Sequence, residues 1–130
     1  MMAEMYAARA DCGLLISEAT DILDNCHGYP NTPGLFSASQ VEGWRAVTSA
    51  VHAKGGLIVA QLWHQGRTGS VFLSGGPEGV VTASAIEGWL DGYGVAQPMS
   101  REASVADIQR IVSAYAAAAS NARAAGFDGV

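Results

Sequence analysis

The stretch LIVAQLWHQGR, residues 57–67, decides the fold class. Its first four residues are apolar. They are followed by an amide, an indole, an imidazole and a guanidinium, which belong to Gln61, Trp63, His64 and Arg67. An apolar run without polar alternation is typical of a strand that is covered on both faces, as in a parallel sheet. We therefore predict a buried strand over residues 57–62 whose carboxyl end carries a binding surface.

A helix precedes this strand. Ser37 and Ser39 are both suitable N-cap residues, and Glu42, three residues after Ser39, completes a capping-box pattern there. Lys54 and two glycines end the helix just before the strand. Apolar residues recur at helical spacing and predict one buried face, formed by Val41, Trp44, Val47, Thr48 and Val51.

An earlier part of the chain follows the same plan. Residues 2–10 are predicted to be helical, residues 11–13 end that helix, and residues 14–16 form a short apolar strand. The polar segment SEAT, residues 17–20, comes directly after this strand. Residues 21–36, with HGYPNTPG at their centre, have the turn chemistry of a long loop.

The last third of the chain predicts one more helix and the beginning of a strand. Residues 64–103 show no sustained periodicity, and SGGPEG within them is better interpreted as a loop than as a phosphate cradle. Ser104 and Asp107 begin a helix by the same capping logic, and residues 127–130 resemble the first residues of a strand. The helix face predicted to point inward consists of Val105, Ile108, Ile111, Val112, Tyr115 and Ala119.

Helices and strands alternate along the chain, which indicates an α/β fold with a parallel sheet. The loops from strand to helix are long, whereas those from helix to strand have two or three residues, as in a (β/α) barrel. A barrel needs eight such units, and this sequence supplies roughly three. We expect residues 1–130 to form one partial (β/α)8 TIM barrel domain, roughly the first half, and the sequence to be incomplete at its C-terminus.

Composition excludes several classes of partner. The formal net charge is −5 and the pI is about 4.9, so nothing draws the chain to nucleic acid or to anionic lipid. No apolar run is long enough to span a membrane, and the N-terminal residues do not resemble a signal peptide, so we expect a cytoplasmic protein. Cys12 and Cys26 lack metal-ligand spacing, so no metal is expected.

The polar residues at the two strand ends allow two interpretations. Glu18, Gln61, His64 and Arg67 can satisfy one another and the neighbouring backbone, and for His64 and Arg67 we favour this structural role. Gln61 differs, because strand alternation places it on the same side as Trp63. An amide beside an indole suits a flat heteroaromatic ligand.

Five ordered segments resemble a known family. GLLISEAT, HGYPNTPG, QVEGWRAVTSAVHAKGG, QLWHQGR and NARAAGFDGV are similar, in register, to the Old Yellow Enzyme family, specifically to its N-terminal portion. These FMN-dependent ene-reductases include N-ethylmaleimide reductase and 12-oxophytodienoate reductase. The resemblance covers nearly the whole chain and is weakest between about residues 71 and 102.

The resemblance implies a fold, a cofactor and a reaction. Family members are (β/α)8 barrels that take a hydride from NAD(P)H onto FMN and pass it to an activated alkene. By position, Ala19 corresponds to a residue whose backbone contacts the flavin, and Gln61 to a glutamine that bonds the pyrimidine edge. Tyr29 and Trp63 correspond to the aromatic lining of the substrate pocket. The family's proton donor, its histidine pair and its phosphate site have no counterparts in these residues, so the catalytic residues are unknown.

Two other functions remain open. The chain could be a truncated, non-catalytic remnant that serves as an interaction module and self-associates through an unpaired strand edge. It could also be an open α/β domain that binds another ligand, although the lack of a phosphate-binding loop disfavours this interpretation. Titration with flavin, NAD and a sugar phosphate would distinguish this last alternative from an FMN-dependent ene-reductase.

Overall fold

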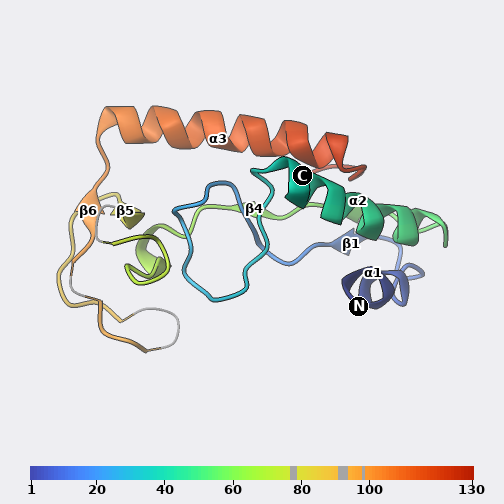
Figure 1. Cartoon of the computed structure of the whole chain (residues 1–130), viewed down its shortest axis with the longest axis horizontal. Helices are drawn as coiled ribbons and strands as arrows, with labels where there is room; N and C mark the ends of the chain where they lie inside the picture. The colour runs from blue at the N-terminus through green and yellow to red at the C-terminus, as the bar shows by residue number, and fades with distance from the viewer. Residues whose placement is uncertain (77–78, 91–93, 98) are drawn as a thin grey trace.

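The computed structural model describes residues 1–76, 79–90, 94–97 and 99–130, and Figure 1 shows their arrangement. Helix α3 runs along one side of the molecule, with α1, α2 and β1 towards one of its ends and β5 and β6 at the other. No helix in these ranges is both long and apolar enough to cross a membrane. In chain order the elements are α1 (Met2–Ala7), β1 (Leu15–Ile16), β2 (Thr20–Asp21), α2 (Ala38–His52), β3 (Ile58–Val59), β4 (Leu62–Trp63), the 3-10 helix η1 (Gly66–Thr68), β5 (Val81–Thr82), β6 (Arg101–Glu102) and α3 (Val105–Ala124).

The strands pair in parallel, as predicted. β1 pairs with β3 and β2 pairs with β4, with α2 as the crossover between them. Gly129 then forms a parallel bridge with Val59, so the C-terminal residues lie beside β3 in the strand direction that the sequence predicts. The sheets are small and do not close, and the predicted strand over residues 57–62 is divided into β3 and β4. It divides because the N–H of Ala60 donates to Gly129, whereas that of Gln61 donates to the Ser17 hydroxyl.

Helix α2 has the predicted buried face, and its cap is the first of the two predicted candidates. Ser37 is the N-cap, and Gln40 completes the capping box. The expected box of Ser39 and Glu42 is wrong for a physical reason. Gln40 Oε1 accepts hydrogen bonds from the N–H groups of both Phe36 and Ser37 at 2.9 Å, whereas the Glu42 carboxylate is engaged by Arg45. Two otherwise unpaired backbone donors are thereby satisfied by one amide.

The central core lies where α1, α2 and the strands meet. Trp44 contacts Tyr6 and Phe127 through tilted ring pairs with centroid distances of 6.1 and 5.2 Å. Its Nε1 donates to the buried carbonyl oxygen of Gly34 at 3.2 Å. The cluster continues through Leu15, Leu35, Val47, Val51, Ile58 and Ala60. These contacts hold β1 and β3 in place under the two helices.

Helix α3 begins at the predicted cap but buries a different face. Ser104 and Asp107 form a capping box, whereas Val105 and Val112, predicted to face inward, are 72 % and 63 % exposed. Ile108 and Tyr115 are also exposed, and only part of the predicted stripe, Ile111 and Ala119, is partly covered. The buried face consists of Ala114, Ala118 and Ala122. Small side chains let the helix approach Ile22 and Leu62 closely. The alanine face is therefore buried in place of the predicted stripe of larger apolar residues.

The segment predicted to be irregular contains a short strand pair. β5 pairs in parallel with β6, and the Thr82 and Ser100 hydroxyls lie 3.2 Å apart between them. Val71, Val80 and Trp89 form a separate small cluster beneath this pair. Of the predicted SGGPEG loop, Pro77 and Glu78 lie outside the described residues.

Candidate functional site

The connection from β1 to β2 and the carboxyl end of β4 form one wall of a cavity of about 250 Å³. Glu18 and Ala19 come from the segment that enters β2, and Trp63 ends β4. The opposite wall is the turn at residues 29–32. Two strands and one loop therefore meet where the sequence places its polar strand ends.

The two aromatic residues of the predicted pocket are stacked. The rings of Tyr29 and Trp63 are nearly parallel, with centroids 6.1 Å apart and an interplanar angle of 12°. The turn that carries Tyr29 is closed by the Thr32 hydroxyl, which donates to the Tyr29 carbonyl oxygen at 3.0 Å. Asn31 adopts a left-handed conformation with φ of 64°, which asparagine tolerates better than most residues. Tyr29 is thus held over the strand end by a defined turn.

Of the predicted flavin contacts, Ala19 lines this cavity and Gln61 lies outside its lining. The backbone of Gln61 is fixed, because its N–H donates to Ser17 Oγ at 3.0 Å and its carbonyl accepts from the N–H of Thr20 at 2.8 Å. Its side chain is exposed and has no hydrogen-bond partner within the described part of the chain. An amide at a strand end, with both its donor and its acceptor free, is available to a ligand.

His64 and Arg67 were expected to brace the loop. His64 does so, since its Nδ1 accepts the N–H of Gly66 at 3.1 Å. Burial, together with the positive charge of Arg110, lowers the pKa of His64, which favours the neutral ring needed for this contact. Arg67 is exposed and makes no hydrogen bond or ion pair within residues 1–76, 79–90, 94–97 and 99–130.

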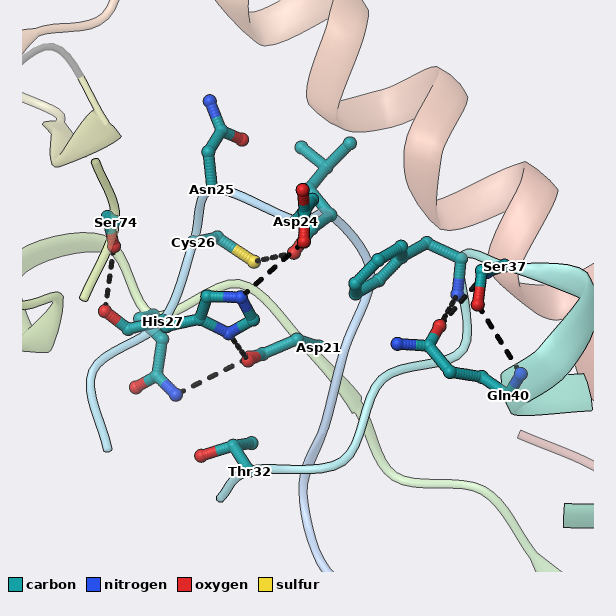
Figure 2. A network of polar contacts seen from close by, with 12 residues as sticks. Asp21, Asp24, Asn25, Cys26, His27, Thr32, Ser37, Gln40 and Ser74 are labelled. Atoms are coloured by element: carbon teal, nitrogen blue, oxygen red, sulfur yellow. Dashed lines mark hydrogen bonds and ion pairs between the residues drawn. The ribbon is translucent and has the colours of Figure 1, made fainter. Parts of the chain in front are cut away.

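A buried polar cluster beside the cavity was missed at the sequence level. Figure 2 shows Asp21 and His27 joined by a hydrogen bond in which His27 Nδ1 donates to the carboxylate at 2.6 Å. Gln65 donates to the same carboxylate at 3.4 Å. Burial raises the pKa of Asp21, and the contact with His27 opposes that rise. The sequence offered one signal for this cluster. Asp21 directly follows the polar segment 17–20, but we interpreted the residues from 21 onward as a loop.

Trp63 adds an unsatisfied donor to this region. Its Nε1 is buried and has no hydrogen-bond partner among the described residues, and the indole opposes the rise that burial causes in the pKa of Asp21. A buried donor of this kind favours a partner.

The cysteines show no sign of a metal site. Cys12 is exposed, Cys26 is buried, and neither forms a disulfide. Burial, followed by the charge of Asp21, raises the pKa of the Cys26 thiol to about 11, so it is protonated at neutral pH. In the described ranges, no group of three His, Cys, Asp or Glu side chains is placed to hold a metal ion.

Comparison with known proteins identifies the family. The family model for the NADH:flavin oxidoreductase / NADH oxidase family matches residues 1–130. This chain belongs to that family. It is 50% identical over 130 residues to the flavin oxidoreductase hxnT of Emericella nidulans, a match covering 98% of this chain and 34% of that protein. It is 41% identical over 126 residues to the putative 12-oxophytodienoate reductase 5 of Oryza sativa subsp. japonica, covering 96% and 34% of the two chains.

Solved structures agree with this assignment. The old yellow enzyme homologue from Zymomonas mobilis superposes with a TM-score of 0.89 at 45% identity, covering 99% of this chain and 37% of that one. Morphinone reductase in complex with tetrahydroNAD superposes with a TM-score of 0.85 at 39% identity, covering 98% and 38%. The chain spans about a third of the length of these relatives. The predicted Old Yellow Enzyme relationship is therefore confirmed, and at the family level the cofactor is FMN and the reductant is a nicotinamide nucleotide.

The residues at the strand ends fit one part of such a cofactor. The aromatic wall of Tyr29 and Trp63 suits a planar ligand, and the exposed amide of Gln61, which lies outside the cavity lining, suits the polar edge of such a ring. The cavity lining contains no lysine or arginine, and Glu18 gives it an acidic residue. The fit is thus to the ring of an Old Yellow Enzyme cofactor, and the lining offers its phosphate no cation.

Proposed function

We propose that the connection from β1 to β2 and the carboxyl end of β4 bind the ring of FMN. The observation that carries this proposal is the shared cavity, where Ala19, Tyr29 and Trp63 come together from two strand ends and one loop. Family membership supplies the identity of the ligand. No residue in the lining of this cavity is specific for a nucleotide phosphate or a metal.

The roles of the individual residues follow from their chemistry. Gln61 donates and accepts hydrogen bonds at the pyrimidine edge of the ring, and the backbone of Ala19 contacts the ring beside it. Tyr29 and Trp63 line the substrate side of the pocket and keep water from it. Bound FMN would supply the hydride chemistry, while the protein fixes its position and tunes its electronics.

At the level of the whole protein, we propose an ene-reductase. The chain would form part of a (β/α)8 barrel in which hydride passes from NAD(P)H, by way of the cofactor, to an alkene activated by a carbonyl or nitro group. The parallel pairing of β1 with β3 and of β2 with β4 supports the barrel, since both pairs have the direction that such a fold needs. The small-molecule substrate enters beside Tyr29 and Trp63.

A comparison of flavins tests ring binding. The purified chain is titrated with FMN, riboflavin, NAD and a sugar phosphate, and flavin fluorescence or calorimetry is recorded. Because the lining has no cation, we expect FMN and riboflavin to bind with dissociation constants within about threefold of each other, a difference below ~0.7 kcal/mol. NAD and the sugar phosphate should not compete. Absence of saturable flavin binding, or competition by the sugar phosphate, would refute the proposal.

A second candidate function is self-association as an interaction module. It is favoured by apolar side chains that are exposed on α3 and on or directly before the paired strands, among them Leu14, Ile16, Leu57 and Val112. Exposed apolar surface next to short strands favours contact with a second copy. Size-exclusion chromatography with light scattering should then give a dimer for the natural chain and a monomer for Ile16→Lys. A monomeric natural chain would exclude this function.

A further inference from the structure

Asp21 lies where the two ends of the Tyr29-bearing loop meet. Its N–H donates to the carbonyl oxygen of Pro33 at 2.8 Å, and its own carbonyl accepts from the N–H of Leu35 at 2.9 Å. The backbone of Asp21 therefore holds the returning end of the loop. Its side chain, which has no solvent exposure, holds the departing end through His27. In the sheet, Asp21 is also the register partner of Trp63.

His27 is fixed from both sides, as Figure 2 shows for its side chain and for its contact with Ser74. Its ring donates to Asp21 at 2.6 Å, and its Nε2 lies 4.0 Å from the exposed carboxylate of Asp24. Its carbonyl oxygen accepts from the N–H of Ser70 at 2.9 Å and from Ser74 Oγ at 2.8 Å. The loop is thus anchored two residues before Tyr29 to two separate parts of the chain.

Gln65 restricts the next residue. A Cβ placed on Gly28 would lie 2.6 Å from Gln65 Oε1 and 2.5 Å from the carbonyl oxygen of Thr68. The backbone at Gly28 therefore passes directly against Gln65, whose amide nitrogen donates to Asp21 and whose oxygen accepts from Thr68 Oγ1. Only a glycine leaves room for this approach.

These contacts form a continuous path from the buried carboxylate to the aromatic stack. We infer that Asp21, His27 and Gln65 are positioning residues that set the distance of Tyr29 from Trp63, and with it the width of the cavity between the turn and the strand ends. The effect on ligand selection rests on the proposed function. The positioning of Tyr29 does not. Buried polar groups that are mutually bonded have one favoured arrangement, which makes them suited to this task.

The consequence is a narrow, flat opening. A phenol and an indole held nearly parallel present a flat wall to a planar ligand, and the Asp21–His27 contact anchors the loop that carries the phenol. Loss of that contact should enlarge the opening and weaken binding of a planar ring. It should leave the exposed Gln61 amide unchanged, since Gln61 is held separately by Ser17 and Thr20.

The test uses a spectroscopic signal of the stack, measured without ligand. The near-ultraviolet circular dichroism of the Tyr29–Trp63 pair is defined as the difference between the natural chain and Tyr29→Leu. We expect His27→Leu to lose at least half of this signal and to weaken riboflavin binding about tenfold. His27→Gln, whose amide can still donate to Asp21, should retain both. Asp24→Leu is the matched control, because it removes the other, solvent-exposed carboxylate near His27, and it should behave as the natural chain.

Each outcome decides the inference. If His27→Leu keeps the full stacking signal, or if His27→Gln loses as much of it as His27→Leu does, the positioning role is wrong. Where far-ultraviolet dichroism shows that His27→Leu does not fold, Gln65→Ala takes its place and should lose signal and affinity in the same direction; an unchanged signal in Gln65→Ala refutes the inference. A natural chain that shows the stacking signal but binds no riboflavin would refute the proposed function alone.

Discussion

Replacement of Trp44 by phenylalanine perturbs the contact that joins the helical core to the candidate site. Trp44 is 4 % exposed, packs against Tyr6 and Phe127, and donates from Nε1 to the carbonyl oxygen of Gly34. Gly34 forms the bridge with Asp21 at which the Tyr29-bearing loop returns to β2. The substitution therefore affects both the stability of the core and the anchoring of the loop.

The expected cost has two parts. Phenylalanine leaves the buried Gly34 carbonyl without its donor, which costs about 1–3 kcal/mol. The missing half of the indole leaves a void, for which we take about 1–2 kcal/mol, a fraction of the ~3–5 kcal/mol of a full Trp→Ala truncation. The sum is about 3 kcal/mol. At roughly 4 °C per kcal/mol for a chain of this size, Tm should fall by about 12 °C.

The measurement is urea unfolding followed by far-ultraviolet circular dichroism, together with a thermal scan. Phe72→Leu is the control, because Phe72 is 71 % exposed and its replacement should change the free energy of unfolding by less than about 0.5 kcal/mol. If Trp44→Phe cost less than about 1 kcal/mol while the control behaved as expected, the buried hydrogen bond and the packing around Trp44 would not stabilise the fold as described.

Three further changes test local parts of the structure. Gly28→Ala places a Cβ 2.5 Å from the carbonyl oxygen of Thr68 and should destabilise the chain by about 1–3 kcal/mol in a thermal scan, whereas alanine at the unobstructed helical Gly43 should not. Ser104→Ala removes the cap of α3 and should cost about 1 kcal/mol in urea, with less helical dichroism; an unchanged midpoint would contradict the cap. The hydrogen bond from His52, followed by that from the N–H of Ile58, lowers the pKa of Asp128. Ionised Asp128 therefore stabilises the fold above the ordinary pKa of aspartate, and this stabilisation is lost as pH falls through the lower pKa of the folded state. Asp128→Asn should reduce the fall in stability between pH 7 and pH 3, and an unchanged profile would argue against this contact.

The features that depend on near neighbours in the sequence were predictable. The capping box of α3 and the buried face of α2 come from residues three or four positions apart, and the structure confirms both. The parallel direction of the strands followed from the alternation of helices and strands. The choice between Ser37 and Ser39 was not predictable from spacing, because it depends on which side chain is free to turn back, and Glu42 is bound to Arg45.

Features that depend on distant residues were not predictable. The buried face of α3 is set by how closely Ile22 and Leu62 allow the helix to approach, so alanines are buried there instead of valines and isoleucine. The contact of Asp21 with Gln65 joins residues 44 apart in sequence and forms only when β2 and β4 have paired, whereas the contact with His27 spans six residues of a segment that we predicted to be a loop. A polar residue beside a strand end indicates a functional surface, but the tertiary structure decides which residues it bonds to.

The most direct test of the central claim, that the connection from β1 to β2 and the carboxyl end of β4 form a flavin-ring site, is one titration series. Riboflavin fluorescence is followed as the natural chain, Gln61→Ala or Gln109→Ala is added. Gln109 is an exposed glutamine on α3 and serves as the matched control. We predict saturable quenching by the natural chain and by Gln109→Ala, and binding about tenfold weaker for Gln61→Ala, which loses roughly 1.4 kcal/mol of hydrogen bonding. Equal affinities for all three chains, or no saturable quenching, would contradict the claim.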